Sequence, residues 1–393
     1  MHLEVTISLI LQPGLALSGL FAILFTATAL YAYAVPQGDR RWWGAAGLLA
    51  ALVLAALLVP SELARMVLLD LAALAAVALV WTHPEARPAA RIYLFTLLVS
   101  IACTAAGMAL GDLLNAETGP APAYPLDRLA AALLIVGFSL KLALAPFYFW
   151  LSGVAASSRP MTTALIVAIL GMAEFSELLH LRQAAPWVFT GHHAIWLALA
   201  LLSMFGGALM ALAQRDLKRM LAFSTIDDMG YLLLGLLIGS SGSLNGAILG
   251  MASHALFKVL LFGAVGIAEK TTGEPLNLDC RGLAVRFPVS SAMFITGTLG
   301  ILGIPPLFGF AGRWQLYLAA VQSGGILLGA AMVLATALAL LYYVRAIHRV
   351  WLGPLPGADQ SPSEPRLAAG ALIVLAVIAL FLGIFPGLFQ IVI

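Results

Sequence analysis

Charged residues are scarce in this chain of 393 amino acids: only 10% are Asp, Glu, Lys or Arg, whereas 62% are hydrophobic. A water-soluble domain usually carries about a quarter charged residues, so this chain could not cover its surface in water. Its 20 basic and 18 acidic residues give a net charge of +2, which argues against a nucleic-acid-binding protein. The composition therefore indicates a polytopic membrane protein in contact with the lipid bilayer.

Cysteine is rare as well. The two cysteines, Cys103 and Cys280, lie far apart and form no CxxC, zinc or iron–sulfur spacing. No glycine-rich loop that could cradle phosphates or a dinucleotide follows a strand-like segment. We therefore expect no metal site and no cofactor in this chain, and no redox or nucleotide-hydrolysing activity unless a partner chain supplies the cofactor.

Long apolar segments are what the chain has in abundance. Crossing a hydrocarbon core of about 30 Å takes roughly 20 apolar residues. We expect each such segment to be helical, because every backbone polar group in lipid needs a partner within the protein. The first segment lacks the basic flank and cleavage site of a signal peptide, so we expect it to be retained. Twelve spans are predicted, at about 14–35, 43–59, 62–82, 92–111, 127–151, 160–181, 192–212, 218–239, 243–268, 288–322, 323–347 and 368–391.

The basic residues in the loops and at the ends of these spans are distributed unequally between the two sets of loops. One set holds fourteen of them, Lys218 included, whereas the opposite set holds only Arg65, Arg128 and Arg182. Because Lys and Arg accumulate in cytoplasmic loops, the sequence predicts a multi-pass protein of a bacterial-type inner membrane with both termini on the outer side. No loop is large enough for a soluble catalytic domain, so residues 1–393 are predicted to form one transmembrane domain.

Ionisable residues lie near the middle of several of these spans, although a charge at the bilayer centre costs about 2.5–3.5 kcal/mol even on the translocon scale. One interpretation is that they form buried salt bridges that only fix helix packing. We favour a relay for ions, because intramembrane ionisable groups mark ion pathways and the charge of a buried lysine depends on its neighbours. Glu177 lies nearer a span end, where an interfacial carboxylate is an equally good interpretation. The predicted relay residues are Asp70, Lys141, Glu174, Asp227, Asp228, His254, Lys258 and Arg313.

Two spans contain helix-breaking residues. Pro146 follows Lys141 by five residues, and Pro305 and Pro306 precede Arg313. Interrupted helices at matching places in two halves of a chain indicate a transport site, although prolines can also be simple kinks. The breaks lie five spans apart, which predicts two five-helix repeats of opposite orientation, at about 43–181 and 192–347. The first helix would flank these repeats, and a final helix would occupy about 368–391.

Four segments carry a specific family resemblance: GFSLKLALAPFYFWL (137–151), LAQRDLKRMLAFSTIDDMGYLLLG (212–235), SHALFKVLLF (253–262) and GIPPLFGFAGRWQLYL (303–318). In this order they resemble the proton-conducting antiporter-like membrane subunits. That family includes the N, M and L subunits of respiratory complex I, related subunits of membrane hydrogenases, and Mrp sodium/proton antiporters. The chain is most similar to the N-type subunit. The family fold has fourteen helices, of which this chain would lack the first two.

The resemblance also implies roles for individual residues. Lys141 matches the lysine of the first broken helix, and Asp70 stands where the family usually has a glutamate that modulates it. The shorter Asp70 side chain favours a contact with Lys141 through water. His254 and Lys258 match the central relay, and Arg313 matches the terminal lysine or glutamate.

This chain departs from the family pattern at three positions. Gly171 stands where many members have a second lysine, with Glu174 one turn further on, and Asp228 replaces a common histidine. Arg313 could hold a fixed charge but could not pass on a proton, because guanidinium does not release its proton in proteins.

These observations predict a proton-translocating, non-redox subunit of a redox-driven respiratory complex of the NADH–quinone oxidoreductase or membrane-hydrogenase type. Its partners would be other membrane subunits and protons, with sodium left open. Two alternatives stay open: a cation/proton antiporter or uptake subunit without a redox partner, and a non-conducting scaffold subunit.

Overall fold

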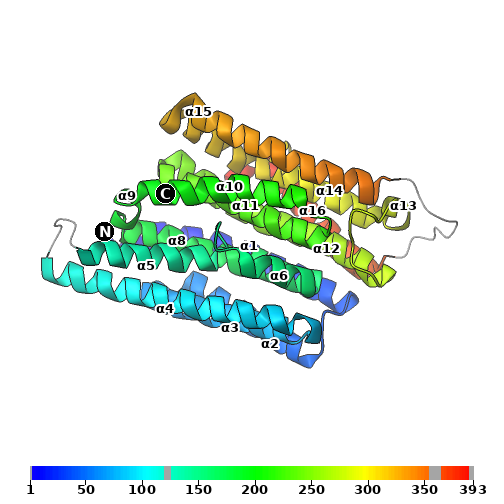
Figure 1. Cartoon of the computed structure of the whole chain (residues 1–393), viewed down its shortest axis with the longest axis horizontal. Coiled ribbons are helices and arrows are strands. Elements are labelled where there is room, and N and C mark those ends of the chain that lie inside the picture. Colours follow the sequence, from blue (N-terminus) through cyan, green and yellow to red (C-terminus); the bar gives the residue numbers. More distant parts are fainter. Residues whose placement is uncertain (1, 119–124, 354–363, 389–393) are drawn as a thin grey trace.

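The computed structural model describes residues 2–118, 125–353 and 364–388. Within these ranges ten helical stretches are long and apolar enough to cross a membrane. Figure 1 shows the long helices side by side in one elongated bundle, with the start of α1 and the end of α16 at the same end. The chain is therefore an all-helical polytopic membrane protein.

The helices follow one another along the chain with short connections. In chain order they are α1 (His2–Ala34), α2 (Arg40–Leu58), α3 (Glu62–Trp81), α4 (Arg87–Thr118), α5 (Pro125–Lys141), α6 (Phe149–Ser157), α7 (Pro160–Ala164), the π-helical η2 (Leu165–Leu170), α8 (Gly171–Ala184), α9 (Trp187–Thr190), α10 (His193–Ala213), α11 (Leu217–Ile238), α12 (Ser241–Thr272), α13 (Leu283–Arg286), α14 (Pro288–Ile301), α15 (Gly309–Ala346), the π-helical η3 (Ile347–Trp351) and α16 (Arg366–Ile384). Short 3₁₀ turns lie at Pro84–Ala86 (η1) and Pro386–Leu388 (η4).

Local sequence explains where several of these helices begin and end. The Asp216 side chain accepts a hydrogen bond from the backbone N–H of Arg219 at the start of α11, and Ser240 caps α12 in the same way through Ser243. Such side chains satisfy backbone donors that have no partner within the helix. α11 and α12 end at Gly239 and Gly273, both left-handed, a conformation that glycine adopts without a steric cost.

The two predicted helix breaks, at Pro146 and at Pro305 and Pro306, both lie between helices. α5 ends at Lys141 and α6 begins at Phe149, with Pro146 in the connection. α14 ends at Ile301 and α15 begins at Gly309, with Pro305 and Pro306 between them. α15 itself bends at Gly325, where the backbone turns non-helical (φ 68°). The structure gives ten long stretches because α5 and α14 are individually short and because α15 runs through this bend without a gap.

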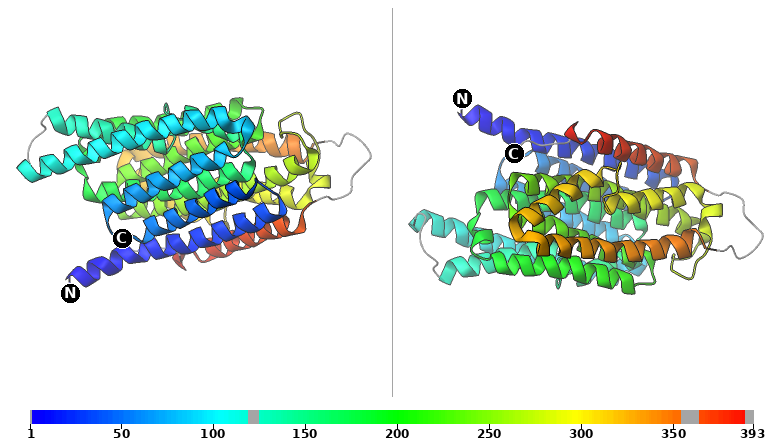
Figure 2. Two further views of the ribbon diagram at one scale, coloured as in Figure 1. Left: turned by 90° about the horizontal axis from the view of Figure 1, so that it is seen from below. Right: turned by 90° about the horizontal axis from the view of Figure 1, so that it is seen from above.

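Close packing in the interior depends on glycine. α11 and α12 are buried along almost their whole length, whereas α1 and α16 lie side by side along one edge of the bundle in both views of Figure 2. A Cβ atom on Gly230 of α11 would lie 2.5 Å from the Met204 nitrogen of α10. A Cβ atom on Gly312 of α15 would lie 2.6 Å from the Gly250 nitrogen of α12. Small residues let membrane helices approach this closely, so α10–α11 and α12–α15 form backbone-to-backbone contacts.

Candidate functional site

A first group of charges surrounds the break between α5 and α6. Lys141, the last residue of α5, has a completely buried side chain whose Nζ lies 2.6 Å from Asp70 Oδ1 of α3 and 3.3 Å from Glu177 Oε2 of α8. Because the Asp70 contact is direct, the expectation of a water-mediated contact is wrong: the helices stand close enough for the shorter carboxylate. We call Asp70, Lys141 and Glu177 the lysine cluster.

Glu177 completes this cluster, although the sequence left its role undecided between a functional carboxylate and an interfacial one. Glu174 lies one turn earlier on α8 and is buried as well. η2, the π-helical turn before α8, changes the helical phase of everything that follows it. The direction in which Glu177 points could therefore not be read from its distance to the end of the span.

A second group of charges surrounds Asp228 in the middle of α11. Its Oδ1 accepts a hydrogen bond from Arg313 Nη2 of α15 at 3.0 Å, and its Oδ2 lies 3.1 Å from His254 Nδ1 of α12. Lys258 Nζ is 4.0 Å from the same Oδ2. Arg313 also donates to the carbonyl oxygen of Ile301 at 2.8 Å. We call Asp228, His254, Lys258 and Arg313 the aspartate cluster.

Arg313 is held in place from several sides. Its guanidinium lies 3.9 Å from the centre of the Tyr231 ring, close enough for a cation–π interaction. The break between α14 and α15 exposes the Ile301 carbonyl to it, because the end of a helix leaves its last carbonyls without partners within the helix. This arrangement fixes a permanent positive charge beside Asp228.

Hydroxyl groups surround the rest of this cluster, and the sequence did not predict them. Lys258 Nζ donates to Ser224 Oγ at 2.5 Å and to the Leu221 carbonyl at 3.0 Å. Ser224 Oγ also accepts from Tyr343 OH at 3.2 Å, and Tyr342 OH donates to Asp227 Oδ2 at 3.1 Å. The only signal in the sequence was a tyrosine pair in an otherwise aliphatic helix, which is equally typical of ordinary packing.

A separate pair of opposite charges lies where α11 begins and α12 ends. This is the end of the bundle opposite to the start of α3. Lys218 Nζ is 3.4 Å from Glu269 Oε2, and both side chains are largely buried. They line a polar cavity of about 370 Å³ together with Ser158 and Arg159. The sequence placed Lys218 among the loop residues and so did not predict this pair.

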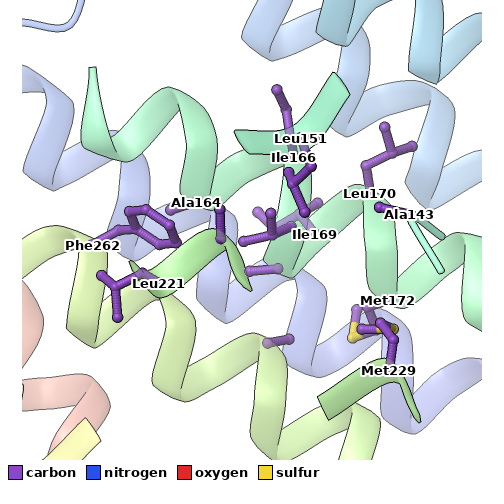
Figure 3. Close-up of a cluster of buried hydrophobic side chains, with 14 of the residues drawn as sticks. Ala143, Leu151, Ala164, Ile166, Ile169, Leu170, Met172, Leu221, Met229 and Phe262 are labelled. Carbon is purple, nitrogen blue, oxygen red and sulfur yellow. The ribbon is translucent and has the colours of Figure 1, made fainter. Parts of the chain in front are cut away.

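A group of apolar side chains packs next to both the lysine cluster and the aspartate cluster. Figure 3 shows Ile166, Ile169, Leu170 and Met172 meeting residues from the break after α5, from α6, α11 and α12. Ala143 of this group lies two residues after Lys141, whereas Leu221 supplies the carbonyl bound by Lys258 and Met229 follows Asp228. The group therefore adjoins both clusters. We call these residues the apolar partition; its labelled members are Ala143, Leu151, Ala164, Ile166, Ile169, Leu170, Met172, Leu221, Met229 and Phe262.

The arrangement can handle protons. All eight predicted relay residues are buried. Six of them belong to the two clusters, Glu174 lies one turn from Glu177 on α8, and Asp227 precedes Asp228 on α11. Among residues 2–118, 125–353 and 364–388, no three His, Cys, Asp or Glu side chains are placed to hold a metal ion. The groups that can exchange a proton are Lys141 with its two carboxylates on one side, and His254 and Lys258 with Asp228 on the other.

Comparisons with known proteins agree with this architecture. The family model described as NADH:quinone oxidoreductase/Mrp antiporter, transmembrane, matches residues 89–339. NADH-quinone oxidoreductase subunit N of Geotalea uraniireducens is 31% identical over 326 residues, covering 79% of this chain and 68% of that protein. NADH-quinone oxidoreductase subunit N 2 of Acidobacterium capsulatum is 36% identical over 278 residues, covering 66% of this chain and 55% of that protein.

A solved structure is also similar. A chain in the structure of respiratory complex I from Thermus thermophilus with bound aureothin is 28% identical and superposes with a TM-score of 0.76, covering 95% of this chain and 85% of that chain. The two curated alignments span only about half to two thirds of the relatives' own length. The matched region nevertheless includes both helix breaks and every predicted relay residue except Asp70. The chain therefore belongs to the NADH:quinone oxidoreductase/Mrp antiporter family of membrane subunits, and within it is similar to subunit N.

Proposed function

We propose that this chain is a proton-translocating, antiporter-like subunit of a redox-driven respiratory complex. The observation that carries the proposal is Lys141, a fully buried amine at a helix break, in contact with two carboxylates from two other helices. A buried lysine takes up or releases a proton according to the charges beside it. Moving Asp70 away from its 2.6 Å contact would favour release, and its return would favour uptake.

The energies involved are compatible with a local trigger. Moving one charge against a membrane potential of 100 mV costs about 2.3 kcal/mol, which corresponds to a change of nearly two pKa units. Removing the partner of a buried charge changes the free energy of its charged form by that amount or more. A small displacement of α3 relative to α5, imposed by a neighbouring subunit, is therefore sufficient to drive the step.

The aspartate cluster would provide a second site of proton exchange, after the lysine cluster. His254 and Lys258 can exchange protons, whereas Arg313 keeps its proton and holds Asp228 ionised. The fixed positive charge of Arg313 would stabilise the Asp228 carboxylate, and Arg313 itself would not transfer a proton.

We further propose a single transmembrane domain of twelve spans. The two interrupted helices, α5–α6 and α14 with the start of α15, would each count as one span, and α15 would be divided at Gly325. The repeats at about 43–181 and 192–347 would then be related by inversion, each with one broken helix. Both ends of this domain would face the outer side, in agreement with the excess of basic residues in the loops of the opposite face.

Partners follow from the same family. The relatives are named as subunits of NADH-quinone oxidoreductase, and the similar solved structure belongs to a respiratory complex. We propose that this chain, too, assembles with other membrane subunits of a redox-driven complex. An antiporter without a redox partner would instead translocate sodium in the absence of electron transfer. A non-conducting scaffold is the alternative that Arg313 and Gly171 favour.

Replacing Lys141 with Met tests the proposal. In proteoliposomes containing the purified complex, the variant should lose proton translocation by this subunit, seen as a lower proton-to-electron ratio. Lys270→Met is the matched control, because Lys270 is exposed at the end of α12. An unchanged ratio in an assembled Lys141→Met complex would reject the role, and sodium transport in membranes without electron donors would favour the antiporter.

A further inference from the structure

A small cavity lies beside Glu177, on the side of the lysine cluster that faces the start of α3. It has a volume of about 30 Å³. Its polar lining is formed by Glu62, Arg65, Thr104, Glu177 and His180, and its apolar lining by Met66, Met108, Phe138 and Leu181. One water needs at least roughly 10–15 Å³ of such volume, so the cavity can hold about two. We call this space the Glu177 cavity.

The Glu177 cavity leads from the lysine cluster towards the surface of the bundle. Glu177 is buried, His180 lies one turn further along α8 and is half-buried, and Glu62 in the first turn of α3 is exposed. Arg65 reaches in the same direction and donates to the Val59 carbonyl, which precedes α3. A file of polar groups therefore connects Glu177 with the end of the bundle that the basic-residue distribution places outside.

In the opposite direction, from the lysine cluster towards Lys258, fewer groups could carry a proton. The apolar partition adjoins both clusters and consists of packed, buried apolar side chains, which neither take up nor release protons. Gly171 contributes no side chain to bridge it. Beyond it, Arg313 is bound to Asp228 and Ile301 and does not release a proton.

We propose that Glu177 is the proton acceptor through which Lys141 discharges to the outer side by way of the Glu177 cavity. This inference rests on the proposed function and adds a route to it. The Lys141 ammonium gives one proton to Glu177 Oε2 across the 3.3 Å contact, leaving a neutral amine and a neutral carboxylic acid. The acid then gives that proton to water in the cavity, from which it passes to the outer aqueous phase.

Charge balance prepares the lysine cluster for the next proton. Asp70, Lys141 and Glu177 together carry one negative charge before the transfer and the same charge after it. Once Glu177 has released the proton, two carboxylates face a neutral lysine. That arrangement strongly favours uptake of a new proton by Lys141. The two carboxylates thus have separate tasks: Asp70 modulates the lysine and Glu177 accepts its proton.

A series of variants in the purified complex in proteoliposomes tests the proposal. Glu177→Gln keeps the size and the hydrogen bond but cannot accept a proton, so translocation by this subunit should fall by about 100-fold. Glu177→Asp keeps an ionisable group and should restore most of it. Glu85→Gln is the matched control, because Glu85 is exposed and lies at the other end of α3.

The outcomes separate this inference from the proposed function. If Lys141→Met abolishes translocation and Glu177→Gln does not, the Glu177 route is wrong while the function stands. If Lys141→Met itself has no effect, the proposed function fails first. Loss in Glu177→Gln with recovery in Glu177→Asp supports both.

A second measurement does not depend on activity. With Cys103 and Cys280 replaced by Ser, Met108→Cys places a thiol in the lining of the Glu177 cavity. Ag⁺ added at the outer face only should protect this thiol from later alkylation by a maleimide in detergent. Protection from the inner face only, or from neither face, would overturn the proposed route.

Discussion

Removing the guanidinium of Arg313 should destabilise the protein markedly. Its Nη2 donates to Asp228 Oδ1 and to the Ile301 carbonyl, and its charge lies over the Tyr231 ring. Arg313→Met keeps much of the side-chain volume but leaves Asp228 without its closest permanent cation. Breaking a buried ion pair by removing one partner costs about 3–5 kcal/mol. We expect about 3 kcal/mol, because Asp228 keeps His254 at 3.1 Å and Lys258 at 4.0 Å.

A double-mutant cycle measures the coupling energy between Arg313 and Asp228. Asp228→Asn removes the charge that Arg313 neutralises, so the double variant should be less destabilised than the sum of the single variants, by about 2 kcal/mol. The free energy of unfolding in detergent micelles, titrated with SDS and followed by circular dichroism, measures both quantities. Arg366→Met is the control, because Arg366 is exposed at the start of α16. The reasoning fails if Arg313→Met lies within about 1 kcal/mol of this control, or if the two sites are additive within about 0.5 kcal/mol.

Two further predictions concern stability. Gly230→Ala should cost about 2–3 kcal/mol, because its Cβ would lie 2.5 Å from the Met204 nitrogen and 2.6 Å from the Ala200 oxygen, both backbone atoms of α10; Gly206→Ala, which faces open space, should be nearly neutral in the same unfolding assay. His83, in the connection after α3, is desolvated by burial and lies near the Arg159 cation, so its pKa is lowered to about 4. The unfolded chain binds this proton near pH 6.5 and the folded chain only near pH 4, so stability should decrease as the pH falls between these values. His83→Gln should show a smaller decrease in melting temperature over that range, and an equal decrease in both proteins would contradict the assignment.

The sequence predicted the main features of the fold because lipid imposes strong rules on it. The length of an apolar segment predicts a span, and the positions of Pro146, Pro305 and Pro306 indicated where helices are interrupted. The buried ionisable residues could be recognised one by one, because a charge in an apolar segment is conspicuous. These features depend on local sequence alone.

The way the charges are grouped could not be predicted in the same way. Whether Glu177 meets Lys141 depends on how α8 is rotated, and the π-helical turn η2 before it alters that rotation. The apolar partition is assembled from several helices and the break after α5, and its members are mostly ordinary Leu, Ile, Met and Ala residues. Nothing in their spacing distinguishes them from lipid-facing residues. Lys218 was placed in a loop, although tertiary packing buries it beside Glu269.

The glycine contact between α12 and α15 has a mechanical consequence. With Gly312 seated against the backbone at Gly250, neither helix can slide or roll past the other without a steric clash. His254 and Lys258 on one helix and Arg313 on the other therefore travel together as a single stiff unit. In the lysine cluster the comparable contact is made by Gly137 of α5, whose Cβ would lie 3.1 Å from the Thr104 nitrogen of α4, whereas none of the glycines described clamps α3 to α8. Any rearrangement that gates conduction should accordingly begin in the half of the bundle that contains Asp70.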